Sequence, residues 1–594
     1  MKKKKIVIHS NHYKAFTGFG KHTKNLLQYL YKTGKYDIVH LANGKSWSDP
    51  CFKHSPWPSF GSLPDDPARL AQLNRDPNLG RAAGYGAEMV DDIIKKEKPD
   101  IYVGIEDIWA FNGYWDRTWW NKLNCMIWTT LDSLPILPDA VTNATKIENY
   151  YVWAPFAERA LNELGHNHVK TLRGSLDTNT FFPLGEQDRF RLLQKHSLSP
   201  SEFIIGFVFR NQLRKSVPNL LDGFKEFTRR NPRAQARLLL HTHWSEGWDI
   251  PRLLQEKEID PQLILTTYFC KNCKQYEIKP FVGQNQNCKF CGSKGSQETT
   301  NVSHGVSESQ LNEIYNLMSV YCHPFTSGGQ EIPIQEAKLT ELITLATNYS
   351  CGEDSCSPES GGLPLDWAEY REPGTQFIKA STSPNSIAKQ LTKVYNLKPD
   401  KRRKQERQSR QYVLDNYSID VVGRQVEEIF DAMPFCDWDF DFTEVPQHPE
   451  YVPADISDNR AWITDLYKNI LNRPDVDSSD EGHQHWMNKL QQGMGREQIL
   501  AYFRQVATEH NAKSQSRVEF ADLLDKDDEG RRILVVMEKN ETDVLLTTSL
   551  LKSLNKLYPT YNLYFATQPE FFELLDENPY IHKVIPVSYT HLTL

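Results

Sequence analysis

The sequence lacks the features that mark membrane-spanning and secreted proteins. None of its 594 residues falls in a long apolar run, so the sequence predicts no transmembrane helix. The basic start MKKKK is followed by only three apolar residues before His9, which is too short for the hydrophobic part of a signal peptide. We therefore expect a cytoplasmic protein.

An excess of positive charge is also absent. The formal net charge of -7 argues against nucleic acid or an anionic membrane as the main partner of the whole chain. Hydrophobic residues make up 39% and charged residues 24% of the sequence, close to the average for soluble globular proteins. We expect several folded domains with their own cores.

A disulfide framework is not expected without a signal peptide, although ten cysteines are present. Four of them stand in two close pairs, CKNC and CKFC. Four thiolates at this spacing suit a closed, tetrahedral zinc site that stabilises a small fold. A redox pair or an iron–sulfur cluster is the alternative. The predicted zinc ligands are Cys270, Cys273, Cys288 and Cys291.

Short apolar runs alternate with amphipathic segments along roughly the first 430 residues. The run KKIVIHS is followed by a glycine-bearing loop and by leucines at helical spacing, and this order recurs. A second such series begins at EFIIGFVFR. Strands that alternate with helices favour parallel sheets covered on both faces. We predict an α/β fold of two Rossmann-like, doubly wound domains, whose ligands bind at the carboxyl ends of the strands.

Shifts in composition predict where the domains end. An acidic, aromatic and proline-bearing stretch separates the α/β part from a compact helical pattern, and a last strand–helix segment is too short to bury both faces of a sheet. The predicted division is a first Rossmann-like domain at 1–184 closed by a helix at about 411–433, a second at 185–410, a zinc-ribbon insertion at 268–296, a linker at 434–456, a small all-α module at 457–515 and a truncated Rossmann-like half domain at 530–594.

Two carboxylates flank a proline in the stretch TSGGQEIPIQEAKL. Pro333 is expected to open a helix, because proline is favoured at the first helical positions. Glu331 would precede this helix and Glu336 would lie in its first turn. A helix N-terminus approached by glycines, here Gly328 and Gly329, can bind an anion through its free N–H groups. An ordinary acidic helix start is the alternative.

Two cations lie in FRNQLRKS, between a predicted strand and a predicted helix. Arg210 and Lys215 could neutralise a diphosphate both when it is bound and when it leaves. Two solvated surface cations are the alternative. In the loop after the first strand, TGFGKH, Gly18 and Gly20 could let a phosphate or an acceptor approach closely, or could form a plain tight turn.

Acidic residues follow strands of the first predicted domain. Asp132, in WTTLDSLP, could orient or deprotonate an acceptor hydroxyl, or could serve as a turn or capping residue. Glu106 and Asp107 are weaker candidates of the same type.

Several of these segments together resemble the retaining glycosyltransferases of family 4, which have the GT-B fold. FRNQLRKS and HPFTSGGQEIPIQEAKL resemble the diphosphate loop and the acidic loop–helix motif of that family. The resemblance covers residues of about 5–433 and implies a nucleotide-sugar donor in the second domain, an acceptor facing the first, and no catalytic metal. RGSLDTNTFFP is similar to the family's segment between the domains, with matches at Gly174, Asp177, Phe181 or Phe182, and Pro183.

In that family the second glutamate of the acidic motif binds the nucleotide ribose, and its position corresponds to Glu336. The loop N–H groups that contact the sugar and the diphosphate correspond to Gly328 and Gly329. The family's first glutamate falls on Gly328 here, and Glu331 stands three residues later. The carboxylate that contacts the sugar is therefore absent or relocated to Glu331, which leaves the identity of the donor sugar open.

The resemblance implies a retaining glycosyltransferase that moves a sugar from a UDP- or GDP-linked donor to a hydroxyl of a glycan or protein. The alternative is a catalytically silent GT-B scaffold in a glycosylation assembly, which the glycine at position 328 supports. Nucleic-acid binding through the zinc ribbon is a third and weaker hypothesis. The expected catalytic residues are Arg210, Lys215, Glu331 and Asp132, and the expected substrate-binding residues are Gly18, Gly20, Gly328, Gly329 and Glu336.

Two further resemblances concern the C-terminal part. Residues 459–511 are similar to the domain of unknown function 4214, a small helical module. Its aspartates at positions 475, 477 and 480 lack the spacing of an EF-hand loop and are expected to form a solvated turn. The segment after about residue 530 looks like the start of a heptosyltransferase-like glycosyltransferase of family 9. Together they imply a multi-enzyme glycosylation protein whose partners include other glycosyltransferase modules.

Overall fold

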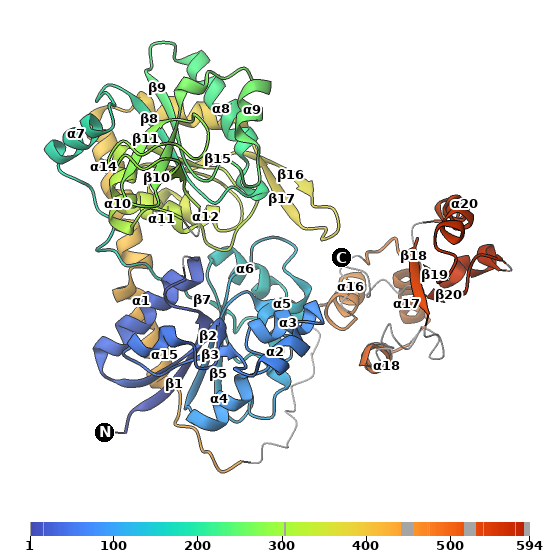
Figure 1. Cartoon of the computed structure of the whole chain (residues 1–594). Helices are drawn as coiled ribbons and strands as arrows, with labels where there is room; N and C mark the ends of the chain where they lie inside the picture. The colour runs from blue at the N-terminus through green and yellow to red at the C-terminus, as the bar shows by residue number, and fades with distance from the viewer. Residues whose placement is uncertain are drawn as a thin grey trace. The chain divides into compact units, whose positions relative to one another are not determined.

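The computed structural model describes residues 2–15, 17–301, 304–440, 456–471, 473, 476–492, 494–515, 530–537, 540–576 and 578–586 (Figure 1). The chain divides into two compact units, one ending at Ser457 and one beginning at Asp458. Most of the predicted linker, Asp475 and residues 587–594 lie outside the described residues.

The first unit begins with a parallel sheet in the order β3-β2-β1-β4-β5-β6-β7. Its apolar runs are buried on both faces, as parallel strands between helices require. The strands are β1 (Lys4–Asn11), β2 (Tyr36–Ser46), β3 (Ser59–Leu63), β4 (Ile101–Ile105), β5 (Asn124–Thr129), β6 (Asn149–Val152) and β7 (Lys170–Thr171). The helices are α1 (Gly18–Thr33), α2 (Pro67–Leu73), α3 (Pro77–Gly84), α4 (Val90–Glu97), α5 (Pro138–Thr142) and α6 (Pro155–Glu163).

Helix α1 starts earlier than its glycine-bearing sequence predicts. The hydroxyl of Thr17 caps the helix by accepting a hydrogen bond from the N–H of Gly20 (3.0 Å). Gly18 and Gly20 therefore stand in the first turn of α1. This corrects the prediction that they belong to the loop before it.

A second sheet follows in the order β11-β10-β9-β8-β13-β14-β15, with β12 paired to β10. It is parallel except for β11 and β12, which run antiparallel to β10. The strands are β8 (Phe203–Val208), β9 (Ala236–His241), β10 (Ile264–Cys270), β11 (Tyr276–Pro280), β12 (Gln297–Thr299), β13 (Val320–His323), β14 (Thr344–Thr347) and β15 (Leu363–Leu365), and a separate hairpin pairs β16 (Trp367–Arg371) with β17 (Ile378–Thr382). The helices are α7 (Glu186–Lys195), α8 (Val217–Arg230), α9 (Ile250–Glu256), α10 (Glu308–Leu317), α11 (Ile332–Leu339), α12 (Gly352–Ser355), α13 (Pro384–Tyr395) and α14 (Pro399–Tyr417).

The last helix of the first unit, α15 (Ile419–Ala432), returns to the first sheet and packs beside α1 (Figure 1). The Glu427 carboxylate of α15 accepts hydrogen bonds from the Tyr29 hydroxyl at 2.6 Å and the Lys35 ammonium at 2.5 Å. Gly423 provides the room for this contact, because a Cβ there would lie 2.5 Å from the Tyr29 ring. The chain thus crosses between the two sheets twice.

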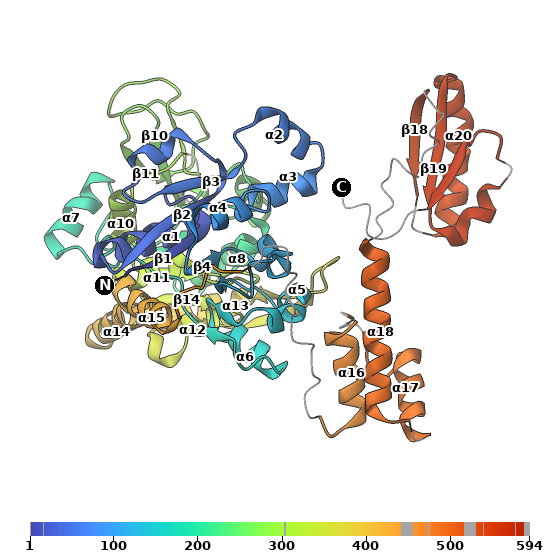
Figure 2. The same cartoon turned by 90° about the horizontal axis from the view of Figure 1, so that it is seen from below.

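The second unit contains helices and a small sheet (Figure 2). Trp486 and Tyr467 pack their rings against Phe503, which joins the three helices into one bundle. The helices are α16 (Asn459–Asn469), α17 (Glu481–Gln491) and α18 (Arg496–Gln515), followed by α20 (Glu541–Leu557) and the parallel strands β18 (Arg531–Val536), β19 (Tyr561–Thr567) and β20 (Lys583–Pro586).

The predicted fold class is confirmed. Two doubly wound α/β sheets are followed by an all-α segment and a further, smaller α/β segment. Among the described residues, no helix combines the length and the apolar character needed to cross a bilayer.

We expect Gly423→Ala to lower the thermal unfolding midpoint of the first unit. The added methyl group would collide with the Tyr29 ring, and such overpacking costs about 1–3 kcal/mol. The matched control is Gly84→Ala in α3, where an added Cβ meets nothing within 4 Å. Unchanged unfolding of Gly423→Ala would contradict the packing of α15 on α1.

Candidate functional site

Loops from both sheets of the first unit meet at the carboxyl ends of their strands. Ser133 follows β5 and Ser327 follows β13, and their hydroxyl oxygens lie 2.9 Å apart. The Lys379 ammonium of β17 donates to both hydroxyls at 2.8 Å. The two sheets therefore come together at the edge where doubly wound folds bind their ligands.

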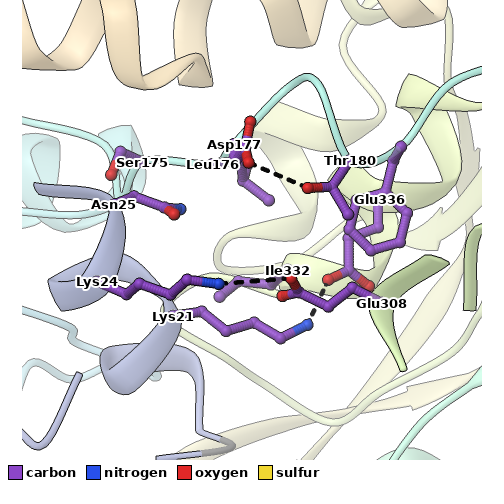
Figure 3. A pocket seen from close by; sticks show the side chains of 11 residues that line it. Lys21, Lys24, Asn25, Ser175, Leu176, Asp177, Thr180, Glu308, Ile332 and Glu336 are labelled. Atoms are coloured by element: carbon purple, nitrogen blue, oxygen red, sulfur yellow. Dashed lines mark hydrogen bonds and ion pairs between the residues drawn. The ribbon is translucent and has the colours of Figure 1, made fainter. Parts of the chain in front are cut away.

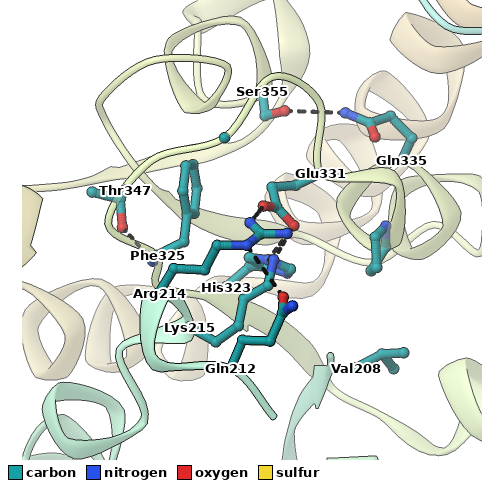
Figure 4. A network of polar contacts seen from close by, with 12 residues as sticks. Val208, Gln212, Arg214, Lys215, His323, Phe325, Glu331, Gln335, Thr347 and Ser355 are labelled. Atoms are coloured by element: carbon teal, nitrogen blue, oxygen red, sulfur yellow. Dashed lines mark hydrogen bonds and ion pairs between the residues drawn. The ribbon is translucent and has the colours of Figure 1, made fainter. Parts of the chain in front are cut away.

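The carboxylate of Glu331 is the centre of a buried polar cluster (Figure 4). Glu331 is 4% exposed and immediately precedes α11. Arg214 donates to one carboxylate oxygen and Lys215 to the other, and His323 Nε2 lies 3.1 Å from the second oxygen. Burial by itself would raise the pKa of Glu331, but the two cations hold this pKa well below its usual range. Glu331 is therefore ionised and occupied by partners within the chain.

Lys215 is the buried cation of this cluster and is 3% exposed. Burial and the neighbouring Arg214 guanidinium lower the pKa of Lys215 to about 8, against the attraction of Glu331. The ammonium still carries its charge at neutral pH. Glu331 cancels one of the two positive charges of the cluster, and Asp132 lies close enough to interact with both cations.

Of the two predicted cations, Arg210 and Lys215, only Lys215 contacts Glu331. The Arg210 side chain is 57% exposed and forms its ion pair with Glu246, with Nε and Oε2 3.8 Å apart. Arg214 stands in the cluster instead, a residue that the sequence analysis missed. Its position directly before Lys215, in the same short segment, is the signal that could have identified it.

The helix predicted to open at Pro333 begins one residue earlier, at Ile332. Glu336 consequently lies just beyond the first turn of α11, which corrects its predicted position. Its carboxylate accepts a hydrogen bond from the Lys21 ammonium of α1 at 2.7 Å (Figure 3). It accepts another from the Tyr315 hydroxyl at 2.8 Å. Burial disfavours the charged form of Lys21, but the Glu336 carboxylate holds the pKa of Lys21 above its usual value.

A small cavity lies beside the Lys21–Glu336 ion pair (Figure 3). Its volume is about 20 Å³, which is room for about one water molecule. Its walls come from α1, from the segment after β7, from the start of α10 and from α11. The polar side chains that line it are Lys21, Lys24, Asn25, Ser175, Asp177, Thr180, Glu308 and Glu336.

Three carboxylates gather at the ends of β4 and β5. Asp132 is solvent-accessible, yet the protein around it and the nearby Glu331 raise its pKa. Burial and then Asp132 raise the pKa of Asp107 to about 6, and the Thr130 hydroxyl donates to Asp107 at 2.8 Å. Burial raises the pKa of Glu106 to about 8. Asp107 and Asp132 can therefore take up a proton more readily than ordinary aspartates.

The glycines of the acidic motif allow close contacts at this junction. A Cβ at Gly329 would lie 2.4 Å from the Thr130 Cβ and 2.8 Å from Asp132 Oδ1. A Cβ at Gly328 would lie 2.7 Å from Glu331 Oε1. Next to them, the Gln330 amide exchanges two hydrogen bonds of 2.9 Å with the backbone of Gly174.

The glycines of α1 have different neighbours. A Cβ at Gly18 would meet the Ile332 side chain at 3.3 Å, at the start of α11. A Cβ at Gly20 would lie 2.3 Å from the Ala15 carbonyl oxygen. Gly18 therefore faces the second sheet, whereas Gly20 is required by the turn that leads into α1.

The four predicted metal ligands come together at the end of β10. Their sulfur atoms all lie within 4.8 Å of one another, with 3.8 Å between Cys270 and Cys291 and 3.6 Å between Cys273 and Cys288. Tetrahedral bonds of about 2.3 Å to zinc place sulfur atoms about 3.8 Å apart. The cluster therefore has the dimensions of a four-thiolate metal site.

Comparison with known proteins gives one family match and several structural matches. The model of the domain of unknown function DUF4214 matches residues 450–513, which confirms the helical module predicted there. No curated protein matches the sequence. A sucrose-phosphate synthase of Thermosynechococcus elongatus is structurally similar over 72% of this chain and 98% of its own, at 15% identity and a TM-score of 0.50.

Two further structural matches have lower scores. A glycosyltransferase of Rickettsia africae ESF-5 matches 73% of this chain and 99% of its own at 13% identity and a TM-score of 0.49. HepE of Anabaena, solved with UDP and glucose, matches 72% of this chain and 100% of its own at 12% identity and a TM-score of 0.48. At such low identity the sucrose-phosphate synthase match shows the fold alone, and the first unit is GT-B-like in fold.

We expect Glu331→Leu to destabilise the first unit by about 3–5 kcal/mol, because it leaves the Lys215 ammonium buried without its carboxylate. Adding Lys215→Met should restore most of the loss, since an apolar pair of similar volume replaces the ion pair. Chemical denaturation of the single and double variants measures both effects.

The matched control for this cycle is Glu246→Leu, which removes the partly exposed partner of Arg210 and should change stability by less than about 1 kcal/mol. If the double variant were as unstable as Glu331→Leu, the coupling between Lys215 and Glu331 would be refuted.

Proposed function

We propose that the first unit is a retaining glycosyltransferase that moves a sugar from a UDP- or GDP-linked donor to a hydroxyl of a glycan or protein acceptor. The observation that carries this proposal is the buried cluster of Arg214, Lys215 and Glu331 before α11. Two cations beside a helix N-terminus suit a diphosphate in the place that the Glu331 carboxylate occupies. The GT-B-like fold is compatible with this activity.

In the proposed reaction the bond from the anomeric carbon to the diphosphate breaks, and a bond to the acceptor oxygen forms on the same face of the sugar. Lys215, with Arg210 and Arg214, neutralises the departing diphosphate, so the chemistry needs no catalytic metal. Asp132, whose pKa is raised, orients the acceptor hydroxyl and accepts its proton.

The remaining predicted residues bind the donor in this proposal. Glu336 holds the nucleotide ribose, and the N–H groups of Gly328 and Gly329 contact the sugar and the diphosphate. Glu331, displaced from the cations, lines the sugar site. Gly18 stands at the start of α1, where an added Cβ would lie 3.3 Å from the Ile332 side chain, and it lets the first sheet approach the donor.

We further propose that the four cysteines hold a structural Zn²⁺. The ion would cross-link the two segments of the insertion that carry the cysteine pairs. All four cluster positions are thiolates, which leaves no open position for a reacting water. We also propose a cytoplasmic location, and other glycosyltransferase modules, starting with the family 9-like segment, as partners.

A second function, a catalytically silent scaffold, is favoured by one observation. Each carboxylate already has its cations as partners. Glu336 accepts from Lys21, and Glu331 accepts from the two cations of its cluster. The cavity beside Glu336 is far too small for a nucleotide sugar in this conformation. A scaffold would keep these contacts permanently, whereas an enzyme must release them to bind its donor.

We expect UDP- or GDP-linked species to raise the unfolding temperature of the protein, and one nucleotide sugar to be hydrolysed or transferred. Arg210→Ala combined with Lys215→Ala should reduce turnover by at least about 100-fold, because it removes charge from the leaving diphosphate. The control is Arg229→Ala, at a side chain that is 72% exposed on α8. Full turnover in the double variant would refute these roles, and no stabilisation by any nucleotide would favour the scaffold.

We expect the purified chain to contain about one zinc ion, measured by elemental analysis, because four thiolates make one closed site. Cys273→Ser should lower the zinc content and the unfolding temperature, whereas Cys351→Ser, a buried cysteine outside the cluster, should keep the zinc. Iron with visible absorbance in place of zinc would contradict this assignment.

A further inference from the structure

The cysteine cluster lies at the carboxyl end of β10, on the same sheet as the cationic loop after β8. Strands β11 and β12 pair with opposite edges of the last part of β10, and the chain between them carries the second cysteine pair. The cluster thus closes a loop whose two ends are held in the sheet. A metal bound to the four cysteines would add to the contacts that already hold this loop, among them the paired backbone hydrogen bonds between Gln286 and Gln297.

The first link from this loop is an aromatic stack. Phe281, directly after β11, stacks on Trp244 with ring centres 4.2 Å apart and an angle of 14° between the planes. The Trp244 indole N–H donates to the Thr266 hydroxyl at 2.8 Å, and its backbone N–H donates to the Thr299 hydroxyl at 3.2 Å. Gln284 donates to the same Thr299 oxygen at 2.7 Å. Trp244 is 3% exposed and is therefore held on several sides by the insertion and its strands.

The second link runs from Trp244 to the cationic loop. The segment that begins at Trp244 ends at Trp248, whose backbone N–H donates to Asn211 at 3.0 Å and whose carbonyl accepts from it at 2.9 Å. The Trp248 indole N–H donates to the Leu213 carbonyl at 3.2 Å. Asn211 is 2% exposed and stands next to Arg210, which pairs with Glu246 of the same segment.

Gly247 shows how closely the segment at 244–248 packs against the cationic loop at 210–215. Gly247 has a φ of +59°, and a Cβ there would lie 2.2 Å from the Asn211 carbonyl oxygen. The stack of Phe281 on Trp244, and the short chain from Trp244 to Trp248, therefore connect the insertion that carries the cysteines to the loop that carries Arg214 and Lys215. Packed and hydrogen-bonded groups of this kind can carry coupling between separate sites.

We propose that the metal-bound insertion positions the cationic loop at 210–215, and so sets its affinity for a diphosphate, through the Phe281–Trp244 stack. The diphosphate part of this inference rests on the proposed function, whereas the coupling of the two loops does not. Phe281 and Trp244 are positioning residues, because they hold the segment whose Trp248 bonds to Asn211.

The test uses the full chain and three variants. Phe281→Ala removes the stack and leaves all four cysteines in place, and Phe281→Tyr keeps a stacking ring. Val282→Ala, at a neighbouring side chain that is 58% exposed, is the control. Zinc content, backbone hydrogen exchange of residues 210–216 and 243–248, and calorimetric binding of inorganic pyrophosphate are measured for each variant.

Phe281→Ala should keep its zinc, exchange backbone hydrogens in both segments at least about tenfold faster, and bind pyrophosphate about tenfold more weakly. Phe281→Tyr and Val282→Ala should behave like the unchanged protein. Removal of the metal by a chelator should reproduce the exchange pattern of Phe281→Ala.

Unchanged exchange of residues 210–216 in Phe281→Ala would overturn the inference, even if residues 243–248 exchanged faster. If no form of the protein bound pyrophosphate, the proposed diphosphate site would fail, and the exchange data would still decide whether the insertion positions the loop.

Discussion

Burying the ammonium of Lys215 costs several kcal/mol, and the carboxylate of Glu331 offsets that cost. The rest of the site is arranged around this ion pair. Arg214 adds a second positive charge, and His323 adds a neutral ring because burial lowers its pKa to about 4. The N-terminus of α11 follows directly, and the dipole of this helix favours an anion at the same point. The site therefore holds the Glu331 carboxylate in this structure, and under the proposed function it would hold the more highly charged diphosphate.

The same region joins the two halves of the first unit. Lys21 reaches from α1 to Glu336, and Lys379 holds the hydroxyls of Ser133 and Ser327 together. Gly329 permits this closeness, because any side chain there would collide with the loop after β5. Under the proposed function, donor binding must separate these contacts. In that proposal, the groups that would bind the donor are the groups that join the two halves, so donor binding and these contacts compete for the same partners.

The insertion in the second sheet adds a further constraint. Its four cysteines make a compact cluster, but its contacts extend to Trp244 and from there to Asn211. Under the proposed coupling, a metal bound by these cysteines would act on the cationic loop without touching its anion. Such an arrangement would separate the proposed metal from the proposed sugar transfer, in which cations of the protein neutralise the leaving diphosphate and Asp132 accepts the proton.

By itself, the sequence determined the two doubly wound sheets, the helical module and the helix after the double glycine. It also determined which four cysteines form the cluster. These follow from local patterns: hydrophobic periodicity, cysteine spacing and the preference of proline for helix starts. The tertiary structure alone decided that Arg214 and not Arg210 meets Glu331, and that Lys21 and Lys379 join the site. Arg210, Arg214 and Lys215 lie within six residues, so their spacing cannot tell which cation turns inward. That choice depends on the packing of Asn211 against Trp248 and of α1 against α11, between segments far apart in the sequence, which no local pattern encodes.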